Sequence, residues 1–191
     1  MINLFQKRKK DVLSKLDKSS IGKWDEKIAR LCEKINSSEN YYTTSSCSGR
    51  IILMIDQEKK GKDLFVFVSH NKVSFDKLKE ELNLALKKNK KIKFKVEPCI
   101  LHVSCETLED AEKLYEKAKI AGWKKSGIIG VKNGFTVELN STERLEFPII
   151  QDKIVLVSDE FLKIVTEEAN KKLEKSWMKI EKLDKLLNKS L

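Results

Sequence analysis

Proline, glycine and aromatic residues are all scarce in this sequence. Its 191 residues include two prolines, seven glycines and 7% aromatic residues. With 40% hydrophobic and 36% charged residues, the composition is that of a folded chain, not a disordered one. The length suffices for one compact domain or two small ones. No apolar run approaches the roughly twenty residues that span a membrane, and the N-terminus lacks a signal-peptide core, so we expect a cytoplasmic protein.

Several nucleotide-binding and catalytic motifs are also missing. The sequence has no GxxxxGKS or GxxxxGKT loop, no GxGxxG after a strand and no GxSxG elbow, which argues against a Rossmann cofactor site. The four cysteines form no CxxC pair, so we expect free thiols. Cys99, His102 and Cys105 are spaced like metal ligands, but on a strand the histidine faces away from both cysteines. We therefore expect no metal site.

Hydrophobic periodicity predicts a mixture of helices and strands. The expected helices cover residues 4–16, 23–36, 74–88, 107–122 and 159–189. The expected strands lie at 50–56, 64–70, 91–97, 99–104, within 126–140, at 144–150 and at 153–157. These elements indicate an α+β fold with a two-layer mixed or antiparallel sheet, helices on one side and a long C-terminal helix.

The order of these elements predicts a single domain. Its parts are a helical N-terminus (1–38), an α/β core (40–157) and a C-terminal helix (158–191). A split β-α-β pattern follows residue 99, and residues 50–97 contain the same kinds of element, a strand hairpin, a helix and a strand, in another order. An internal duplication is therefore an open alternative, although the self-similarity is weak.

One short stretch, YYTTSSCSGRI at residues 41–51, looks like neither an amphipathic helix nor a buried strand. We interpret it as a turn that reads anions and amides. Its serines offer hydroxyls in a small space, and Gly49 allows close backbone approach or a positive φ. Arg50 presents a forked cation that suits a carboxylate or a phosphate. A solvated Ser/Thr connection is the alternative.

Charge is the strongest bulk signal. Thirty-nine basic and 29 acidic residues give a net charge of +10, which favours a polyanionic partner such as RNA. A lysine-rich composition of the thermophilic kind is the alternative explanation. The basic segments expected to contact RNA are residues 7–10, then Lys87, Lys88, Lys90 and Lys91, and finally Lys124 and Lys125.

Longer segments carry a resemblance to a known family. They are KLDKSSIGKWDEKI, YYTTSSCSGRI, FKVEPCILHVSCETLEDAEKLYEKAKIAGWKKSGII, ERLEFPI and IVTEEANKKL. Together they resemble the tRNA wybutosine-synthesizing protein 3 family, in its archaeal type, over nearly the whole chain. The resemblance implies methylation of a ring nitrogen in a tricyclic, wyosine-type guanosine derivative beside the anticodon of phenylalanine tRNA. It also implies S-adenosylmethionine as the methyl donor, on a fold that is not a Rossmann methyltransferase.

The resemblance also suggests roles for particular residues. The expected catalytic residues are His102, Ser46 and Arg50, with His102 as a base for the proton that the substrate nitrogen loses. A hydrogen-bonded structural histidine is the alternative for His102. The residues expected to bind cofactor or substrate are Tyr42, Thr44, Ser45, Ser48 and Gly49. Exposed aromatic rings for base stacking are expected at Tyr41, Tyr42 and Trp123. The alternative function is a basic tRNA-binding accessory protein without chemistry.

Overall fold

The structure, a computed structural model, describes residues 3–14, 24–57, 61, 64–131 and 134–188. Its helices are α1 (Leu4–Leu13), α2 (Glu26–Ser37), α3 (Phe75–Leu86), α4 (Leu108–Ala121) and α5 (Asp159–Leu187). Its strands are β1 (Tyr41–Cys47), β2 (Arg50–Ile55), β3 (Phe65–Ser69), β4 (Ile92–Glu97), β5 (Ile100–Cys105), β6 (Gly127–Gly130), β7 (Phe135–Asn140), β8 (Leu145–Gln151) and β9 (Ile154–Val155). The chain divides into two compact units. Unit 1 comprises Met1–Ser48, Cys99–Thr142 and Ser176–Leu191, and unit 2 comprises Gly49–Pro98 and Glu143–Lys175.

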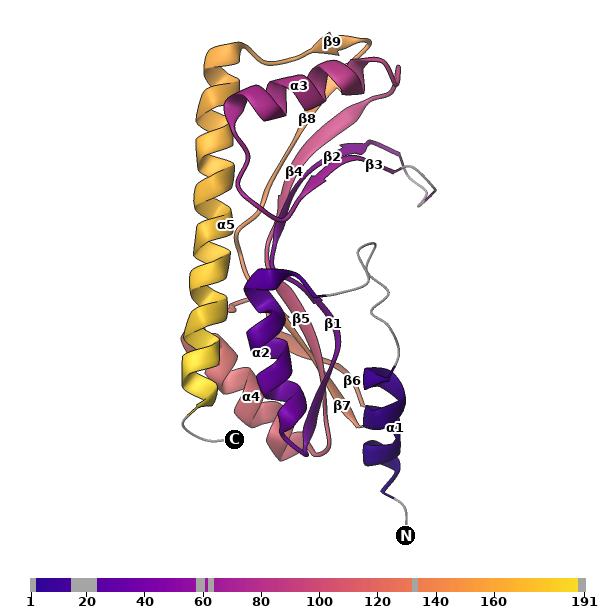
Figure 1. Cartoon of the computed structure of the whole chain (residues 1–191), viewed down its shortest axis with the longest axis vertical. Coiled ribbons are helices and arrows are strands. Elements are labelled where there is room, and N and C mark those ends of the chain that lie inside the picture. The colour runs from indigo at the N-terminus through magenta and orange to yellow at the C-terminus, as the bar shows by residue number, and fades with distance from the viewer. Residues whose placement is uncertain (1–2, 15–23, 58–60, 62–63, 132–133, 189–191) are drawn as a thin grey trace. The chain divides into compact units, whose positions relative to one another are not determined.

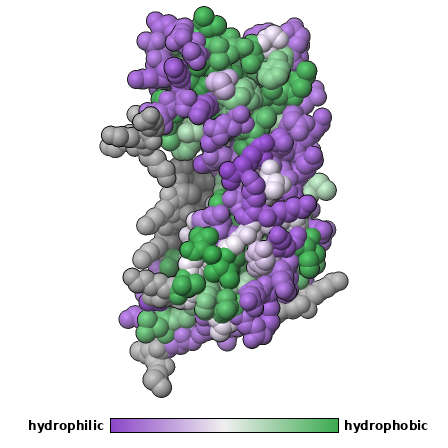
Figure 2. Space-filling view, turned by 180° about the vertical axis from the view of Figure 1, so that it is seen from behind, coloured by the Kyte–Doolittle hydropathy of each residue, from purple (hydrophilic) through white to green (hydrophobic). Residues whose placement is uncertain are grey.

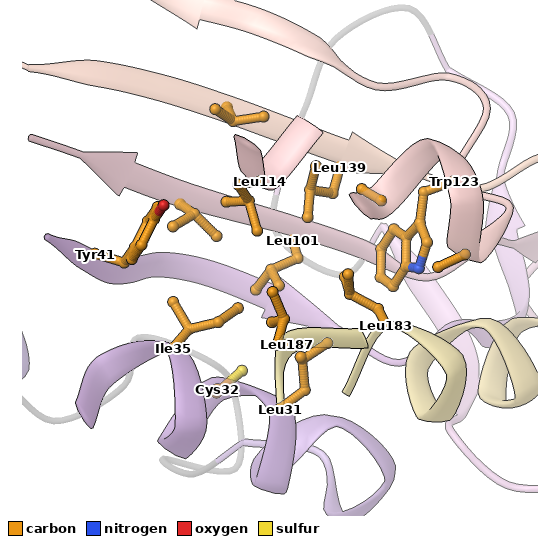
Figure 3. Packing of buried hydrophobic residues seen from close by; sticks show 14 of the residues in the cluster. Leu31, Cys32, Ile35, Tyr41, Leu101, Leu114, Trp123, Leu139, Leu183 and Leu187 are labelled. Carbon is orange, nitrogen blue, oxygen red and sulfur yellow. The ribbon is translucent and has the colours of Figure 1, made fainter. Parts of the chain in front are cut away.

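Unit 1 contains a four-stranded antiparallel sheet in the order β1-β5-β7-β6. Alternation along β5 sets its two faces, since Leu101 and Val103 are buried while His102 is partly exposed. The apolar stripes of α2, α4 and residues 176–187 of α5 join the inner face in one buried cluster (Figure 3). Trp123 is fully buried in it and donates its indole N–H to the Lys179 carbonyl at 3.2 Å.

Helix α1 lies against the outer face of the same sheet (Figure 1). Phe5 is its buried residue, and the Phe5 ring centroid lies 5.1 Å from that of Tyr42 on β1. Tyr42 is therefore only 5% exposed. Farther along β1, Thr44 and Ser45 are exposed, so α1 leaves part of the outer face open.

Helix α4 begins and ends as its sequence predicts. The Thr107 hydroxyl accepts from the Asp110 N–H at 3.1 Å, and the Asp110 carboxylate accepts from the Thr107 N–H at 3.2 Å. This reciprocal capping box satisfies N–H groups that the first helical turn leaves unpaired. Gly122 ends the helix in the left-handed region at φ 98°, which glycine adopts without steric cost.

Cys105 makes the stability of unit 1 depend on pH. Its thiol is fully buried at the end of β5, and this burial raises its pKa to about 12. The unfolded chain releases the same proton near pH 8.5. The unfolding free energy should therefore fall as the pH rises from about 8.5 towards 12, by at most about 1.4 kcal/mol per pH unit for this group.

Urea unfolding at several pH values between about 8 and 10.5 checks this expectation. Replacement Cys105→Ala should make the fall with pH shallower than in the unaltered chain. An equally steep fall in Cys105→Ala would assign the pH dependence to another group, such as Tyr41, whose pKa burial also raises.

Unit 2 contains a five-stranded antiparallel sheet in the order β3-β2-β4-β8-β9. The buried residues of α3 and of residues 159–175 of α5 are Leu78, Leu82, Ala85, Leu162, Val165, Thr166, Ala169 and Leu173. Asn170 on α5 fixes the segment before α3, because its side chain accepts from the Val73 N–H at 3.0 Å and donates to the Val73 carbonyl at 2.8 Å. Unit 2 is thus a two-layer α+β body, whereas α1 adds a third layer to unit 1.

The predicted fold class is confirmed, with several corrections. The sheets are antiparallel and the C-terminal helix is long, but the strands form two sheets, and α1 lies on the face opposite the other helices of unit 1. The segment 41–47 is a strand whose first three residues are buried, not a turn. Tyr41, Tyr42 and Trp123, which the sequence predicts as exposed, are 5%, 5% and 0% exposed, because each packs into unit 1.

In the part of the chain that the structure describes, no helix is both long and apolar enough to cross a bilayer. From behind, hydrophilic residues cover much of the surface, and hydrophobic residues gather in separate patches (Figure 2). Much of the charged composition is therefore displayed to solvent.

Candidate functional site

A β-bulge in β1 sets the geometry of the outer face of unit 1. Thr43 pairs with Val103 of β5, but the next pair is Ser45 with His102, so Thr44 is an extra residue on β1. A bulge of this kind interrupts the alternation of side chains. Thr44 and Ser45 are consequently both exposed although they are neighbours in sequence.

Three polar side chains lie in a row across neighbouring strands of this face. Ser45 on β1 pairs with His102 on β5, and His102 pairs with Glu138 on β7. The Ser45 Oγ lies 2.7 Å from His102 Nδ1, and His102 Nε2 lies 2.9 Å from Glu138 Oε2. The side chains of His102 and Glu138 are 26% and 31% exposed. The row is therefore linked by hydrogen bonds and open to solvent.

The partners of His102 select a tautomer. A carboxylate only accepts hydrogen bonds, so Glu138 requires a proton on Nε2. In the neutral imidazole Nδ1 is then the acceptor, and the Ser45 hydroxyl donates to it. A second proton on Nδ1 gives an imidazolium that Glu138 stabilises by charge. The row can thus accept one proton, the task that the sequence predicts for His102.

Other predicted site residues of unit 1 point elsewhere. Ser46 faces inward beside Leu101, and its buried Oγ has no hydrogen-bond partner among the described residues. Ser48 is fully buried, and both its N–H and its hydroxyl donate to Asp25 Oδ2, at 2.8 and 3.1 Å. The expected exposure of Tyr42 is therefore wrong, and Ser45 is the serine that lies beside His102. The roles expected of Ser46 and Ser48 stay predictions.

Three more predicted residues of unit 1 are exposed. The Thr44 hydroxyl donates to the His102 carbonyl at 3.4 Å, next to the row. Lys124 and Lys125 follow α4 and are exposed. Their role in RNA binding stays a prediction.

Arg50 begins β2 in unit 2 and is held on two sides. Its Nε donates to Glu97 Oε2 at 2.7 Å, and its guanidinium carbon lies 4.9 Å from the centre of the Phe65 ring. On the same face of the unit 2 sheet, further ion pairs link β4 to its neighbours, namely Lys95–Glu97, Lys95–Glu146, Lys93–Glu146 and Lys93–Asp56. Gly49, which precedes Arg50, has φ 101°. This is the positive φ that we expect glycine to allow there. Glu97 on β4 and Phe65 on β3 thus hold the Arg50 side chain, and its binding role stays a prediction.

Sequence reasoning missed Glu138, the third member of the row. The alternation in FTVELN places Glu138 on the polar face of its strand, but only the pairing of β5 with β7 brings it to His102. Single-sequence periodicity contains no such pairing information. The bulge at Thr44 was hidden for the same reason.

Comparison with known proteins assigns the chain to a family. A family model described as Methyltransferase TYW3 matches residues 7–189. The chain belongs to this methyltransferase family. Ser45, His102 and Glu138 all lie within the matched span, so the row is part of a TYW3 methyltransferase.

Named relatives resemble the chain over most of its length. A tRNA wybutosine-synthesizing protein 3 homolog from Danio rerio is 36% identical over 193 residues, 98% of this chain and 76% of that protein. In Pyrococcus horikoshii, tRNA(Phe) 7-((3-amino-3-carboxypropyl)-4-demethylwyosine(37)-N(4))-methyltransferase 1 is 36% identical over 192 residues, 96% of this chain and 95% of that protein. A methyltransferase of the same substrate name from Archaeoglobus fulgidus is 34% identical over 186 residues, 95% of this chain and 92% of that protein.

Solved structures agree with the fold. The structure of the PH1069 protein from Pyrococcus horikoshii matches with a TM-score of 0.86 and 36% identity, covering 96% of each chain. A hypothetical protein from Aeropyrum pernix matches with a TM-score of 0.73 and 24% identity, over 86% of this chain and 98% of that one. The second likeness concerns the fold alone.

Proposed function

We propose that the chain transfers a methyl group from S-adenosylmethionine to N4 of a wyosine-type guanosine derivative in phenylalanine tRNA. Two archaeal relatives carry names that specify this base, this atom and this tRNA, and they are 36% and 34% identical to the chain. The net charge of +10 suits a partner made of phosphodiesters. We place the reaction in the cytoplasm, where tRNA is available.

The row of Ser45, His102 and Glu138 is the observation that carries the proposal. Methylation of a ring N–H would form a nitrogen–carbon bond, break the methyl–sulfur bond of the donor, which leaves as S-adenosylhomocysteine, and release one proton. The proton passes to His102 Nδ1, directly or through the Ser45 hydroxyl, 2.7 Å away. The Glu138 carboxylate, 2.9 Å from Nε2, stabilises the imidazolium that results. A proton acceptor placed in this way contributes about 10²- to 10⁴-fold to a rate.

Other groups in each unit suit the two substrates. When bound, S-adenosylmethionine supplies an electrophilic methyl group on a sulfonium, so the protein's further task is to position the nitrogen. The exposed hydroxyls of Thr44 and Ser45 and the Glu138 carboxylate are suitable partners for ribose hydroxyls and an ammonium group. In unit 2, Arg50 is the proposed contact for a carboxylate or phosphate of the RNA substrate.

The test is methyl transfer from labelled S-adenosylmethionine to phenylalanine tRNA that carries the unmethylated precursor. We expect one methyl group per tRNA, and donor binding in calorimetric titration without RNA. Binding of tRNA with no methyl transfer, and no donor binding at millimolar concentration, would instead support a basic accessory protein without chemistry.

A further inference from the structure

A cleft made only of unit 2 residues lies where three connections of its sheet meet. It encloses about 390 Å³, within the usual range for small-ligand sites. The end of β2, the turn between α3 and β4, and the β8–β9 hairpin contribute its walls. The lining residues that matter here are Asp56, Asn89, Lys90, Lys91, Asp152 and Lys153. A backbone hydrogen bond from the Asp56 N–H to the Lys91 carbonyl, 2.9 Å long, joins two of the walls.

Positive charge prevails in this cleft. Lys90, Lys91 and Lys153 line it and are exposed. Asp56 is already neutralised by Lys93, whose Nζ lies 2.9 Å from Asp56 Oδ1. The hydrogen bond to Asp56 raises the pKa of Lys93, which favours its charged form. Asp152 is the one lining carboxylate that has no ion-pair partner in the described part of the chain. The excess of ammonium groups attracts anions.

Unusual backbone geometry is concentrated at the same cleft. Among the described residues, the non-glycine residues with positive φ are Asn89 (50°), Asp152 (51°) and Lys153 (63°), and all three line it. Gln151 pairs with Ile154, so Asp152 and Lys153 form a two-residue hairpin turn. Such turns with two positive φ angles strongly prefer Asn-Gly or Asp-Gly. A lysine with positive φ at this position costs conformational free energy. Residues with such unfavourable backbone angles cluster at binding sites.

We propose that this cleft binds phosphate groups of the tRNA backbone through Lys90, Lys91 and Lys153. The inference rests on the proposed function, because a tRNA methyltransferase must hold a chain of phosphodiesters. The proposal assigns RNA binding to only two of the four lysines that the sequence predicts as RNA contacts between residues 87 and 91. Lys90 and Lys91 line the cleft, whereas Lys87 and Lys88 follow the C-terminus of α3, where positive charge stabilises the helix dipole.

The first experiment measures tRNA binding across a salt series for the triple variant Lys90→Ala, Lys91→Ala and Lys153→Ala. Each lost phosphate contact lowers the magnitude of the log–log salt slope by about 0.7 to 0.9, so the loss of three contacts should lower it by about 2.1 to 2.7. The control removes three exposed lysines of α5 with the same loss of charge, as Lys171→Ala, Lys175→Ala and Lys182→Ala. Equal slopes in the two triple variants would overturn the proposal, because net charge alone would then explain the binding.

A second variant, Lys153→Gly, separates binding from folding. Glycine suits the positive φ, so the thermal midpoint should rise, while tRNA affinity should fall. A raised midpoint with unchanged affinity would remove Lys153 from the RNA contact and overturn the proposal. These assays use unmodified tRNA transcript, so they succeed or fail independently of methyl transfer.

Inorganic phosphate at constant ionic strength is the last probe. The proposal expects weak phosphate binding in the unaltered chain and loss of both phosphate and tRNA affinity in the triple variant. Saturable phosphate binding, together with unaltered tRNA binding in the triple variant, would show a small-anion site and overturn the RNA assignment.

Discussion

Replacing His102 by alanine is expected to lower the rate of methyl transfer by about 10²-fold or more, with tRNA and donor affinities unchanged. The physical reason is that His102 is proposed to take up the released proton. Its Nδ1 is hydrogen-bonded to the Ser45 hydroxyl and its Nε2 to the Glu138 carboxylate. Single-turnover kinetics with precursor tRNA measures the chemical step without product release.

Neighbouring variants distinguish a proton acceptor from a structural histidine. Glu138→Gln keeps a hydrogen bond but removes the charge that stabilises the imidazolium, so we expect an intermediate rate. If His102→Ala and His102→Gln turn over normally, the histidine serves only to join β1, β5 and β7.

Periodicity in the sequence predicted most of unit 1 because its inner face is apolar. The alternation in ILHVSC correctly placed Leu101 and Val103 inside and His102 outside. Thr107 and Gly122 marked the ends of α4 because both act locally, through a cap and a positive φ. Features that depend on one or a few neighbouring residues are readable without the fold.

Features that depend on partners distant in sequence were not readable. Tyr42 looked available for stacking, but α1 brings Phe5 onto it. Ser48 looked like a ligand contact, but Asp25 before α2 accepts from it twice. In both cases the deciding residue lies far away in the chain, and no local pattern names it.

The second large effect is expected at Arg50, where Arg50→Lys should lower kcat/KM for precursor tRNA by about tenfold or more. The substitution keeps the charge but loses the planar fork. Arg50 donates from Nε to Glu97 at 2.7 Å and stacks on Phe65 at 4.9 Å, so two neighbours orient its remaining N–H groups. Lysine has a single ammonium group. It cannot donate to Glu97 and at the same time present two parallel N–H donors to a substrate, as the guanidinium of arginine can.

Matched variants show whether the loss comes from recognition or from folding. Surface ion pairs and exposed cation–π contacts each contribute about 1 kcal/mol or less, so urea unfolding of Arg50→Lys should show only a small change. Glu97→Gln weakens the orientation of Arg50 but keeps the guanidinium, and should lose less activity than Arg50→Lys. Equal losses in both variants would mean that the Arg50–Glu97 pair acts by holding β2 against β4. Normal turnover by Arg50→Lys would show that any cation suffices there, and the contact to the substrate carboxylate or phosphate would have to come from another residue.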